Sequence, residues 1–285
     1  MAQTVKIISD STCDLSKDLL EKYDIAILPL HILLGETEYR DGVDITPEEI
    51  FRWSDENKTT PKTSAPSMTE AMEVMKTFLD EGREIICFSI SDSMSTSGNV
   101  MRLAAEELEA SDKVTVINSA NLSTGIGLQV IQAAILSAEG KTRAQITAAI
   151  EEIRPRVRAS FTVDTLTYLY RGGRCNAVAA LAGTMLKLHP RIVVEDGAMD
   201  ASKKYRGKLG SVILSYTKDM EEELKNAVAD RVFITHSGCD REIVESVRSY
   251  LESLGIFNEI LETRAGGVIS SHCGPGTLGV LFIEK

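Results

Sequence analysis

The residues of this sequence best suited to chemistry are hydroxyls concentrated in one short segment. Ser91-Asp92-Ser93-Met94-Ser95-Thr96-Ser97-Gly98 holds four serines and one threonine. It follows an apolar run, Glu84–Ile90, that predicts a buried strand, and it precedes a helical pattern over Gly98–Ala110. Hydroxyls and free backbone amides at the start of a helix can hold an oxyanion. One of Ser95 and Ser97 is expected to cap the helix, and the remaining hydroxyls favour a bound anion.

Other polar loops could meet this segment, because ligands of open α/β sheets bind beyond the carboxyl ends of the strands. Asp10-Ser11-Thr12 follows the first strand, where a turn or a helix cap is the simpler interpretation. Thr63-Ser64-Ala65-Pro66 could equally be a turn. Arg171-Gly172-Gly173-Arg174 offers two guanidiniums, which suit a carboxylate or a phosphate. His272 lies in a Gly/Pro-rich segment, His272–Thr277, that predicts a loop, and a lone histidine is usually structural.

Common catalytic motifs are missing from the sequence. It has no Walker A motif, no Gly-x-Gly-x-x-Gly after the first strand, no His-Glu-x-x-His and no Gly-x-Ser-x-Gly. Clustered hydroxyls without an evident activating base favour binding over nucleophilic catalysis. The alternative is a small-molecule enzyme, a phosphotransferase or hydrolase, that uses Ser95 and His272 in the same cleft.

The elements that must position these loops alternate between strand and helix in the first half, which predicts a mainly parallel sheet. Capping boxes at Thr46 and Ser67 mark two of the helices. Ile25–Leu34 is expected to be one strand that pairs with Thr37–Arg40 across a Gly35-Glu36 turn. The remaining strands are predicted at Val5–Ser9, Glu84–Ile90 and Val114–Asn118, and the remaining helices at Ser16–Tyr23, Gly98–Ala110, Ser123–Glu139 and from Thr142 to about Arg154.

The second half predicts a mixed sheet, because Asp196-Gly197 joins two strand patterns as a hairpin. Its strands are expected at Ala159–Val163, Arg191–Glu195, Met199–Arg206, Arg231–His236, Ile256–Glu262 and Val280–Ile283, and its helices at Thr165–Tyr170, Ala177–Leu188, Leu209–Val228 and Glu242–Leu254. The fold class is therefore α/β with two domains. We place the boundary near Pro155–Ala159, which gives an N-terminal domain of residues 1–157 and a C-terminal domain of residues 158–285.

Charge and cysteine content exclude several classes of protein. The chain has 285 residues with 31 Lys and Arg against 42 Asp and Glu, a net charge of −11. Nucleic acids and anionic lipid surfaces are therefore improbable partners. The longest apolar runs are too short to span a bilayer, and no secretory signal is evident, which favours a cytoplasmic protein. Five widely spaced cysteines predict neither a disulfide framework nor a zinc site.

Taken in order, the loops resemble the DegV family of bacterial fatty-acid-binding proteins. The resemblance begins at Ile8-Ser9-Asp10-Ser11-Thr12-Cys13-Asp14-Leu15 and includes Tyr39-Arg40-Asp41-Gly42 and Thr63-Ser64-Ala65-Pro66-Ser67. It continues at Tyr168-Leu169-Tyr170-Arg171-Gly172-Gly173-Arg174 and closes with His272-Cys273-Gly274-Pro275-Gly276-Thr277-Leu278-Gly279. It implies a DegV-like fold of two α/β domains that buries one long-chain fatty acid. It further implies a carrier without cofactor or catalysis of its own, which presents the acid to a separate ATP-dependent fatty acid kinase subunit.

The resemblance also implies the residues that hold the carboxylate. By position these are Thr63, Ser95, Arg174 and His272, with Ser64 as a neighbour. Hydroxyls, arginine and protonated histidine are donors that a desolvated carboxylate needs. The sequence departs from the family's usual Ser-Ser-x-Leu-Ser-Gly-Thr loop at Asp92, Met94, Thr96, Ser97 and Gly98, whereas Ser95 is retained.

Overall fold

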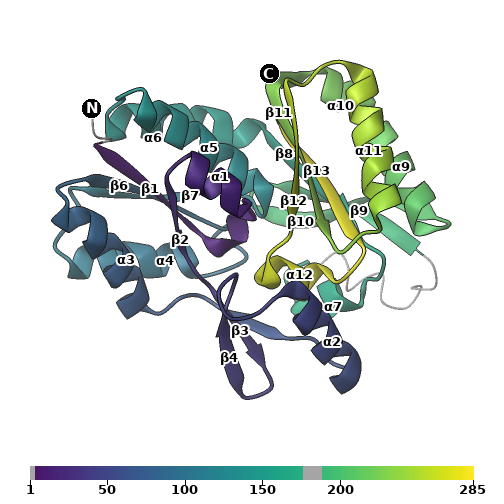
Figure 1. Cartoon of the computed structure of the whole chain (residues 1–285), viewed down its shortest axis with the longest axis horizontal. Coiled ribbons are helices and arrows are strands. Elements are labelled where there is room, and N and C mark those ends of the chain that lie inside the picture. Colours follow the sequence, from purple (N-terminus) through teal and green to yellow (C-terminus); the bar gives the residue numbers. More distant parts are fainter. Residues whose placement is uncertain (1–3, 176–187) are drawn as a thin grey trace.

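Two β-sheets, each flanked by helices, make up most of the computed structural model, which describes residues 4–175 and 188–285 (Figure 1). The first is a four-stranded sheet in the order β2-β1-β6-β7, and all its pairs are parallel. Its central strands are buried along nearly their whole length, as expected when helices cover both faces. The strands are β1 (Val5–Asp10), β2 (Ile25–Leu28), β6 (Glu84–Ser89) and β7 (Val114–Asn118).

Helices cover the two faces of this parallel sheet. On one face, α3 (Met68–Asp80) and α4 (Ser97–Glu107) pack against Ile8, Ile85 and Cys87. The other face contacts α1 (Lys17–Lys22), α5 (Thr124–Ala138) and α6 (Arg143–Ile153). The predicted parallel α/β arrangement of the first half is confirmed.

A separate three-stranded antiparallel sheet corrects one prediction. The expected strand Ile25–Leu34 is two strands, β2 and β3 (His31–Leu34), which belong to different sheets. The break falls at Pro29-Leu30, where proline has no backbone N–H to donate to a ladder. The predicted hairpin is present between β3 and β4 (Thr37–Arg40), and β5 (Lys62–Ser64) pairs on the other side of β3. The two predicted capping boxes also form, at α2 (Pro47–Asn57) and at α3.

The second large sheet has six strands in the order β10-β9-β8-β13-β11-β12. Only β11 and β12 pair in parallel, so the predicted mixed sheet is confirmed. The strands are β8 (Val157–Thr162), β9 (Leu188–Glu195), β10 (Ala198–Arg206), β11 (Ala227–Ser237), β12 (Glu259–Arg264) and β13 (Thr277–Glu284). Its helices are α7 (Thr167–Gly172), α9 (Leu209–Asp219), α10 (Glu221–Lys225), α11 (Arg241–Leu254) and α12 (Gly267–Cys273).

Two predictions for the second half are wrong, and a third falls almost entirely outside the described residues. The expected helix Leu209–Val228 is two helices, because the chain turns at Met220 and β11 already begins at Ala227. The segment predicted as a loop at His272 is the end of α12, a short helix that two adjacent glycines, Gly266 and Gly267, conceal in the sequence. The predicted helix Ala177–Leu188 lies outside the described residues, apart from Leu188, which begins β9.

The largest hydrophobic cluster joins the two large sheets. It runs from Phe88 of the parallel sheet through Ile126 on α5 to Phe161, Phe233 and Leu281 of the mixed sheet. The chain passes from α6 through a single 3₁₀ turn, Arg154–Arg156, into β8. The two sheets thus share one core. The domain boundary at 157/158 remains a prediction. In the ranges 4–175 and 188–285, no helix is long and apolar enough to cross a membrane.

Candidate functional site

A cavity of about 410 Å³ lies where elements of both halves meet. Its wall is formed by the Ser91–Gly98 segment, hereafter the serine loop, by β5 and the residues after it, by the end of α7 and by α12. All five residues predicted from the sequence line it, namely Thr63, Ser64, Ser95, Arg174 and His272. The rest of the wall is largely apolar and comprises Leu30, Ile90, Met94, Leu122, Leu169, Met199, Val268, Ile269 and Cys273 among others.

Most hydroxyls of the serine loop already donate to protein acceptors. Ser91 and Ser93 both donate to the carbonyl oxygen of Gly197, at 2.6 and 2.5 Å, in the turn between β9 and β10. Ser97 donates to the carboxylate of Asp10, with 2.9 Å between oxygens. These three serines join the loop to its surroundings, so the number of serines alone overstates the donors available to a ligand.

Ser95 is the serine of this loop whose hydroxyl proton is not donated to any described residue. Its Oγ accepts the backbone N–H of Ser97 at 3.2 Å, at the first turn of α4. The N-cap of α4 is Thr96, whose side chain makes no capping bond, so the prediction of a cap at Ser95 or Ser97 is wrong. Ser95 instead accepts the first N–H of the helix, and its O–H is still available to a ligand. Ser97 cannot take over this role, because it is itself the first residue of α4 and supplies the N–H.

Thr63 and His272 form a pair across 209 sequence positions. Thr63 Oγ1 lies 2.8 Å from His272 Nε2, and Thr63 is held in β5 opposite Ile32 of β3. The other ring nitrogen, Nδ1, is buried without a hydrogen-bond partner in the described structure. A Cβ atom on Gly172 would lie 2.4 Å from Nδ1, so glycine is required for this packing.

His272 is neutral near pH 7. Burial, together with the charge of Arg174, lowers the pKa of His272 to about 4. The residue therefore contributes a hydrogen bond and not the positive charge expected from the sequence. A hydrogen on Nδ1 would have no acceptor, whereas a hydrogen on Nε2 is accepted by Thr63 Oγ1. In that tautomer the hydroxyl of Thr63 is free to donate into the cavity.

Arg174 supplies the positive charge of the site. It is exposed beside the cavity, and its Nη1 donates to the carbonyl oxygen of Gly172 at 2.7 Å. No carboxylate of the described residues forms an ion pair with it. Asp92 also lines the cavity, and it pairs with Arg102 at 3.1 Å, so its charge is partly balanced.

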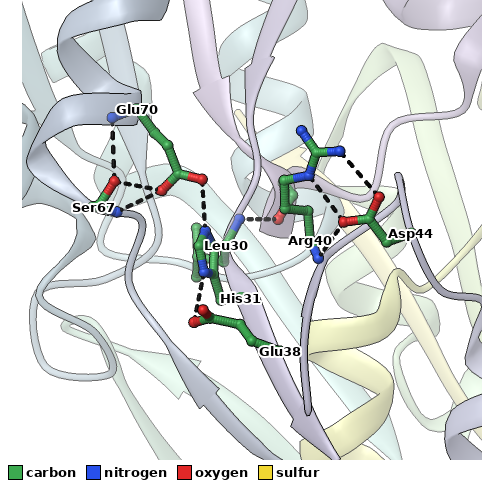
Figure 2. A network of polar contacts seen from close by, with 8 residues as sticks. Leu30, His31, Glu38, Arg40, Asp44, Ser67 and Glu70 are labelled. Carbon is green, nitrogen blue, oxygen red and sulfur yellow. Dashed lines mark hydrogen bonds and ion pairs between the residues drawn. The ribbon is translucent and has the colours of Figure 1, made fainter.

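A polar network stabilises the β3–β4 hairpin, which pairs with the strand that carries Thr63 and Ser64 (Figure 2). His31, which faces Ser64 across β3 and β5, lies between Glu38 and Glu70, with its ring nitrogens at 2.7 and 2.9 Å from their carboxylates. Burial opposes a charge on His31, but the two glutamates outweigh it and raise its pKa. Because Glu70 also closes the capping box of α3, the network joins the hairpin to that helix.

A second cavity, of only about 20 Å³, adjoins the first. It shares Leu122, Ile269 and Cys273 with the main cavity and is also lined by Phe161 and Leu281. Sequence reasoning did not identify these apolar residues, because apolar side chains that line a cavity cannot be distinguished in sequence from those that fill a core. The main cavity therefore combines several polar side chains with a larger number of apolar ones.

A larger cavity, of about 910 Å³, fits a small apolar ligand less well. It lies on the side of α6, β8 and β9 and is lined by Arg154, Arg158 and Arg191 among other residues. Each of these arginines pairs with a glutamate, as in the contact of Arg191 with Glu223 at 2.8 Å. Its cations are therefore already neutralised, and no predicted site residue lines it.

The fold is that of an α/β protein with one parallel and one mixed sheet, and its cavity is lined by both polar and apolar side chains. Residues 4–285 match the family model described as "Uncharacterised protein, DegV family", and the chain belongs to the DegV family. It is 32% identical to a DegV domain-containing protein of Clostridium perfringens over 99% of each chain.

Solved structures support the same assignment. A fatty-acid-binding DegV family protein from Thermus thermophilus matches with a TM-score of 0.91 and 31% identity, over 99% of this chain and 100% of that one. A stearic-acid-binding protein from Eubacterium ventriosum matches with a TM-score of 0.85 and 32% identity, over 99% and 98% of the two chains.

Within the described ranges, Cys13, Cys87, Cys239 and Cys273 form no disulfide. The described residues contain no group of His, Cys, Asp and Glu side chains that could hold a metal ion.

Proposed function

We propose that this protein binds one long-chain fatty acid, with the carboxylate at the polar side chains of the 410 Å³ cavity and the acyl chain against its apolar ones. The observation that carries this proposal is the composition of the wall of one cavity. Thr63, Ser95 and Arg174 line it as available donors, and most of its other lining residues are apolar. The fatty-acid ligands of the Thermus thermophilus and Eubacterium ventriosum proteins support the same ligand class.

The donors suit a carboxylate for physical reasons. A carboxylate that leaves water must replace its lost hydrogen bonds, and charge-assisted bonds of this kind are worth about 1.5–3 kcal/mol each. Ser95 and Thr63 offer hydroxyl protons, and Arg174 offers a guanidinium with no ion-pair partner in the described residues. His272 contributes indirectly, because its Nε2–H bond to Thr63 leaves the Thr63 proton for the ligand. Ser64 adds a further exposed hydroxyl to the rim.

We propose further that the protein is a carrier and not an enzyme. Nucleophilic catalysis by Ser95 would need a base on its hydroxyl, but His272 pairs with Thr63 instead. That pairing argues against the alternative phosphotransferase or hydrolase. We therefore expect no cofactor, and we expect a separate ATP-dependent kinase subunit in the cytoplasm to phosphorylate the presented carboxylate.

Thermal unfolding with matched ligands tests the binding proposal. Stearic acid at 100 times its dissociation constant should add about 2.7 kcal/mol of apparent stability. For a chain of 285 residues that corresponds to a rise of roughly 4–5 °C in unfolding temperature. Stearyl alcohol, which has the same tail and no charge, should raise the temperature far less. Equal shifts with acid and alcohol would contradict a specific carboxylate site.

The kinase proposal needs its own assay. The purified chain with ATP and stearic acid should form no acyl phosphate, and product should appear only when a fatty acid kinase subunit is added. Acyl phosphate made by the single chain would support the alternative enzyme.

A further inference from the structure

Two motifs of the sequence, Asp10–Asp14 and Tyr39–Gly42, contain buried aspartates that do not line the cavity of the proposed ligand site. Asp10 and Asp14 flank the turn after β1, and Asp41 follows β4. Their exposed fractions are 0%, 5% and 2%, respectively. Buried carboxylates are costly unless they are fully hydrogen-bonded, so the partners of these three groups indicate what they do.

Asp10 binds both ends of the serine loop. Its Oδ2 accepts the backbone N–H of Ile90 and the hydroxyl of Ser97, both at 2.9 Å. These two residues flank Ser91–Thr96, the part of the loop that contains Ser95. Its Oδ1 accepts the backbone N–H and the hydroxyl of Thr12, at 3.2 and 2.5 Å. Each carboxylate oxygen of Asp10 therefore accepts two hydrogen bonds from the protein.

Asp14 and Asp41 bind the start of α12, the helix that carries His272. Asp14 Oδ1 accepts the backbone N–H of Gly266 at 2.8 Å, and Asp41 Oδ1 accepts that of Gly267 at 2.7 Å. These are N–H groups that have no partner within the helix itself. The second oxygens accept hydroxyls, from Ser123 to Asp14 at 2.5 Å and from Ser11 to Asp41 at 2.8 Å.

The close approach at α12 depends on the absence of a side chain. A Cβ on Gly267 would lie 2.9 Å from Asp41 Oδ1 and 2.5 Å from Ile32 Cδ1. Ile32 is the residue that faces Thr63 across β3 and β5. The contact therefore packs α12 against the pair of strands, β3 and β5, that holds Thr63. This packing places His272 Nε2 2.8 Å from Thr63 Oγ1.

From these contacts we propose that the buried carboxylates of Asp10, Asp14 and Asp41 are positioning residues for the head-group site. Asp10 fixes the serine loop and with it Ser95. Asp14 and Asp41 fix α12 and with it the contact between His272 and Thr63. This inference rests on the proposed fatty-acid function and extends it, because it assigns a role to three residues that do not line the cavity.

The readout is the ratio of the affinity for stearic acid to that for stearyl alcohol. A change that only destabilises the fold leaves this ratio unchanged, whereas a displaced donor lowers it. Substitution by asparagine should affect Asp10 and Asp41 differently, because Asp10 accepts backbone N–H groups at both oxygens and Asp41 accepts one N–H and one hydroxyl. Both oxygens of Asp10 accept backbone N–H groups, so the amide of Asp10→Asn must face one of them and displace it. In Asp41→Asn the oxygen can still accept from Gly267, and the amide can donate to Ser11.

We expect Asp10→Asn and Asp41→Ala to lower the ratio roughly tenfold and Asp41→Asn to change it by less than about twofold. Tyr216→Phe is the matched control. It removes a buried hydroxyl that donates to Ser160 and accepts from Val280 in the mixed sheet, so it should cost stability without changing the ratio. Milder versions of the two perturbations are Ser97→Ala and Ser11→Ala, which keep the aspartates and should lower the ratio about threefold.

The outcomes separate this inference from the proposed function. If the wild type itself does not discriminate acid from alcohol, the proposed function is wrong. If the wild type discriminates and the ratio is unchanged in the variants of Asp10 and Asp41, the function stands and the positioning role is wrong. If either aspartate variant fails to fold, the two serine variants decide, and an unchanged ratio in both overturns the inference.

Discussion

Replacing Ser95 by alanine removes two interactions at once, and the structure predicts a separate consequence for each. The Oγ of Ser95 accepts the N–H of Ser97 at 3.2 Å, so the variant should lose about 1 kcal/mol of stability, the usual net contribution of one hydrogen bond. Ser97 cannot compensate, because it is the first residue of α4 and its own N–H is the group that loses its acceptor. The variant should also lose a donor to the carboxylate, worth about 1.5–3 kcal/mol, and bind stearic acid roughly tenfold to a hundredfold more weakly.

Chemical denaturation and calorimetric titration on the same preparations measure the two effects. Ser93→Ala is the matched control from the same loop, because the Ser93 hydroxyl donates to Gly197, which keeps its bond from Ser91. It should bind stearic acid nearly as well as the wild type. Ser95→Thr, which retains a hydroxyl, should recover most of the affinity. Reduced stability with wild-type affinity in Ser95→Ala would show that Ser95 serves only to accept the N–H of Ser97.

Three further predictions follow from the geometry and the shifted pKa values. Gly172→Ala places a methyl group 2.4 Å from His272 Nδ1 and should weaken stearic acid binding about tenfold in calorimetric titration, with less effect on stearyl alcohol; equal losses for both ligands would contradict a head-group effect. Because the pKa of His31 is raised in the folded protein, its stabilising contribution is complete below pH 6.5 and is lost as the pH rises through the folded-state pKa. His31→Gln should therefore cost more stability at pH 6 than at pH 9. An equal cost at both pH values would argue against a protonated His31. Burial raises the pKa of Asp41 to about 6, so the stability of the wild type should fall as the pH rises between about 4 and 6. Asp41→Asn lacks this group, so its unfolding temperature should rise relative to that of the wild type over the same interval. A difference in unfolding temperature that does not change with pH would refute the shift.

The serine loop illustrates what could be predicted from the sequence. An apolar run, a cluster of hydroxyls and a helical pattern are all local features, and the structure has the strand, the loop and the helix in that order. The resemblance to the DegV family indicated which of the scattered polar residues meet, and Thr63, Ser64, Ser95, Arg174 and His272 do line one cavity. Their roles in binding remain predictions.

The long-range contacts could not be predicted in the same way. Asp10 does accept the N–H of Thr12, as the local interpretation of a turn or cap requires, but the same side chain also reaches Ile90, 80 positions away. The neutral state of His272 depends on burial by segments distant in sequence and on Arg174. The helix α12 is hidden because two glycines at its start, Gly266 and Gly267, are usually typical of a loop, whereas here they admit the carboxylates of Asp14 and Asp41.

Mass spectrometry of the purified protein, first under native and then under denaturing conditions, tests the central claim most directly. The account predicts that the native protein carries one additional mass in the range of long-chain fatty acids, and that this mass is released as a free carboxylic acid when the protein unfolds. It also predicts that protein stripped of this ligand takes up one equivalent of stearic acid. A native protein of unaltered mass that fails to take up stearic acid, or a released ligand without a carboxylate, would contradict it.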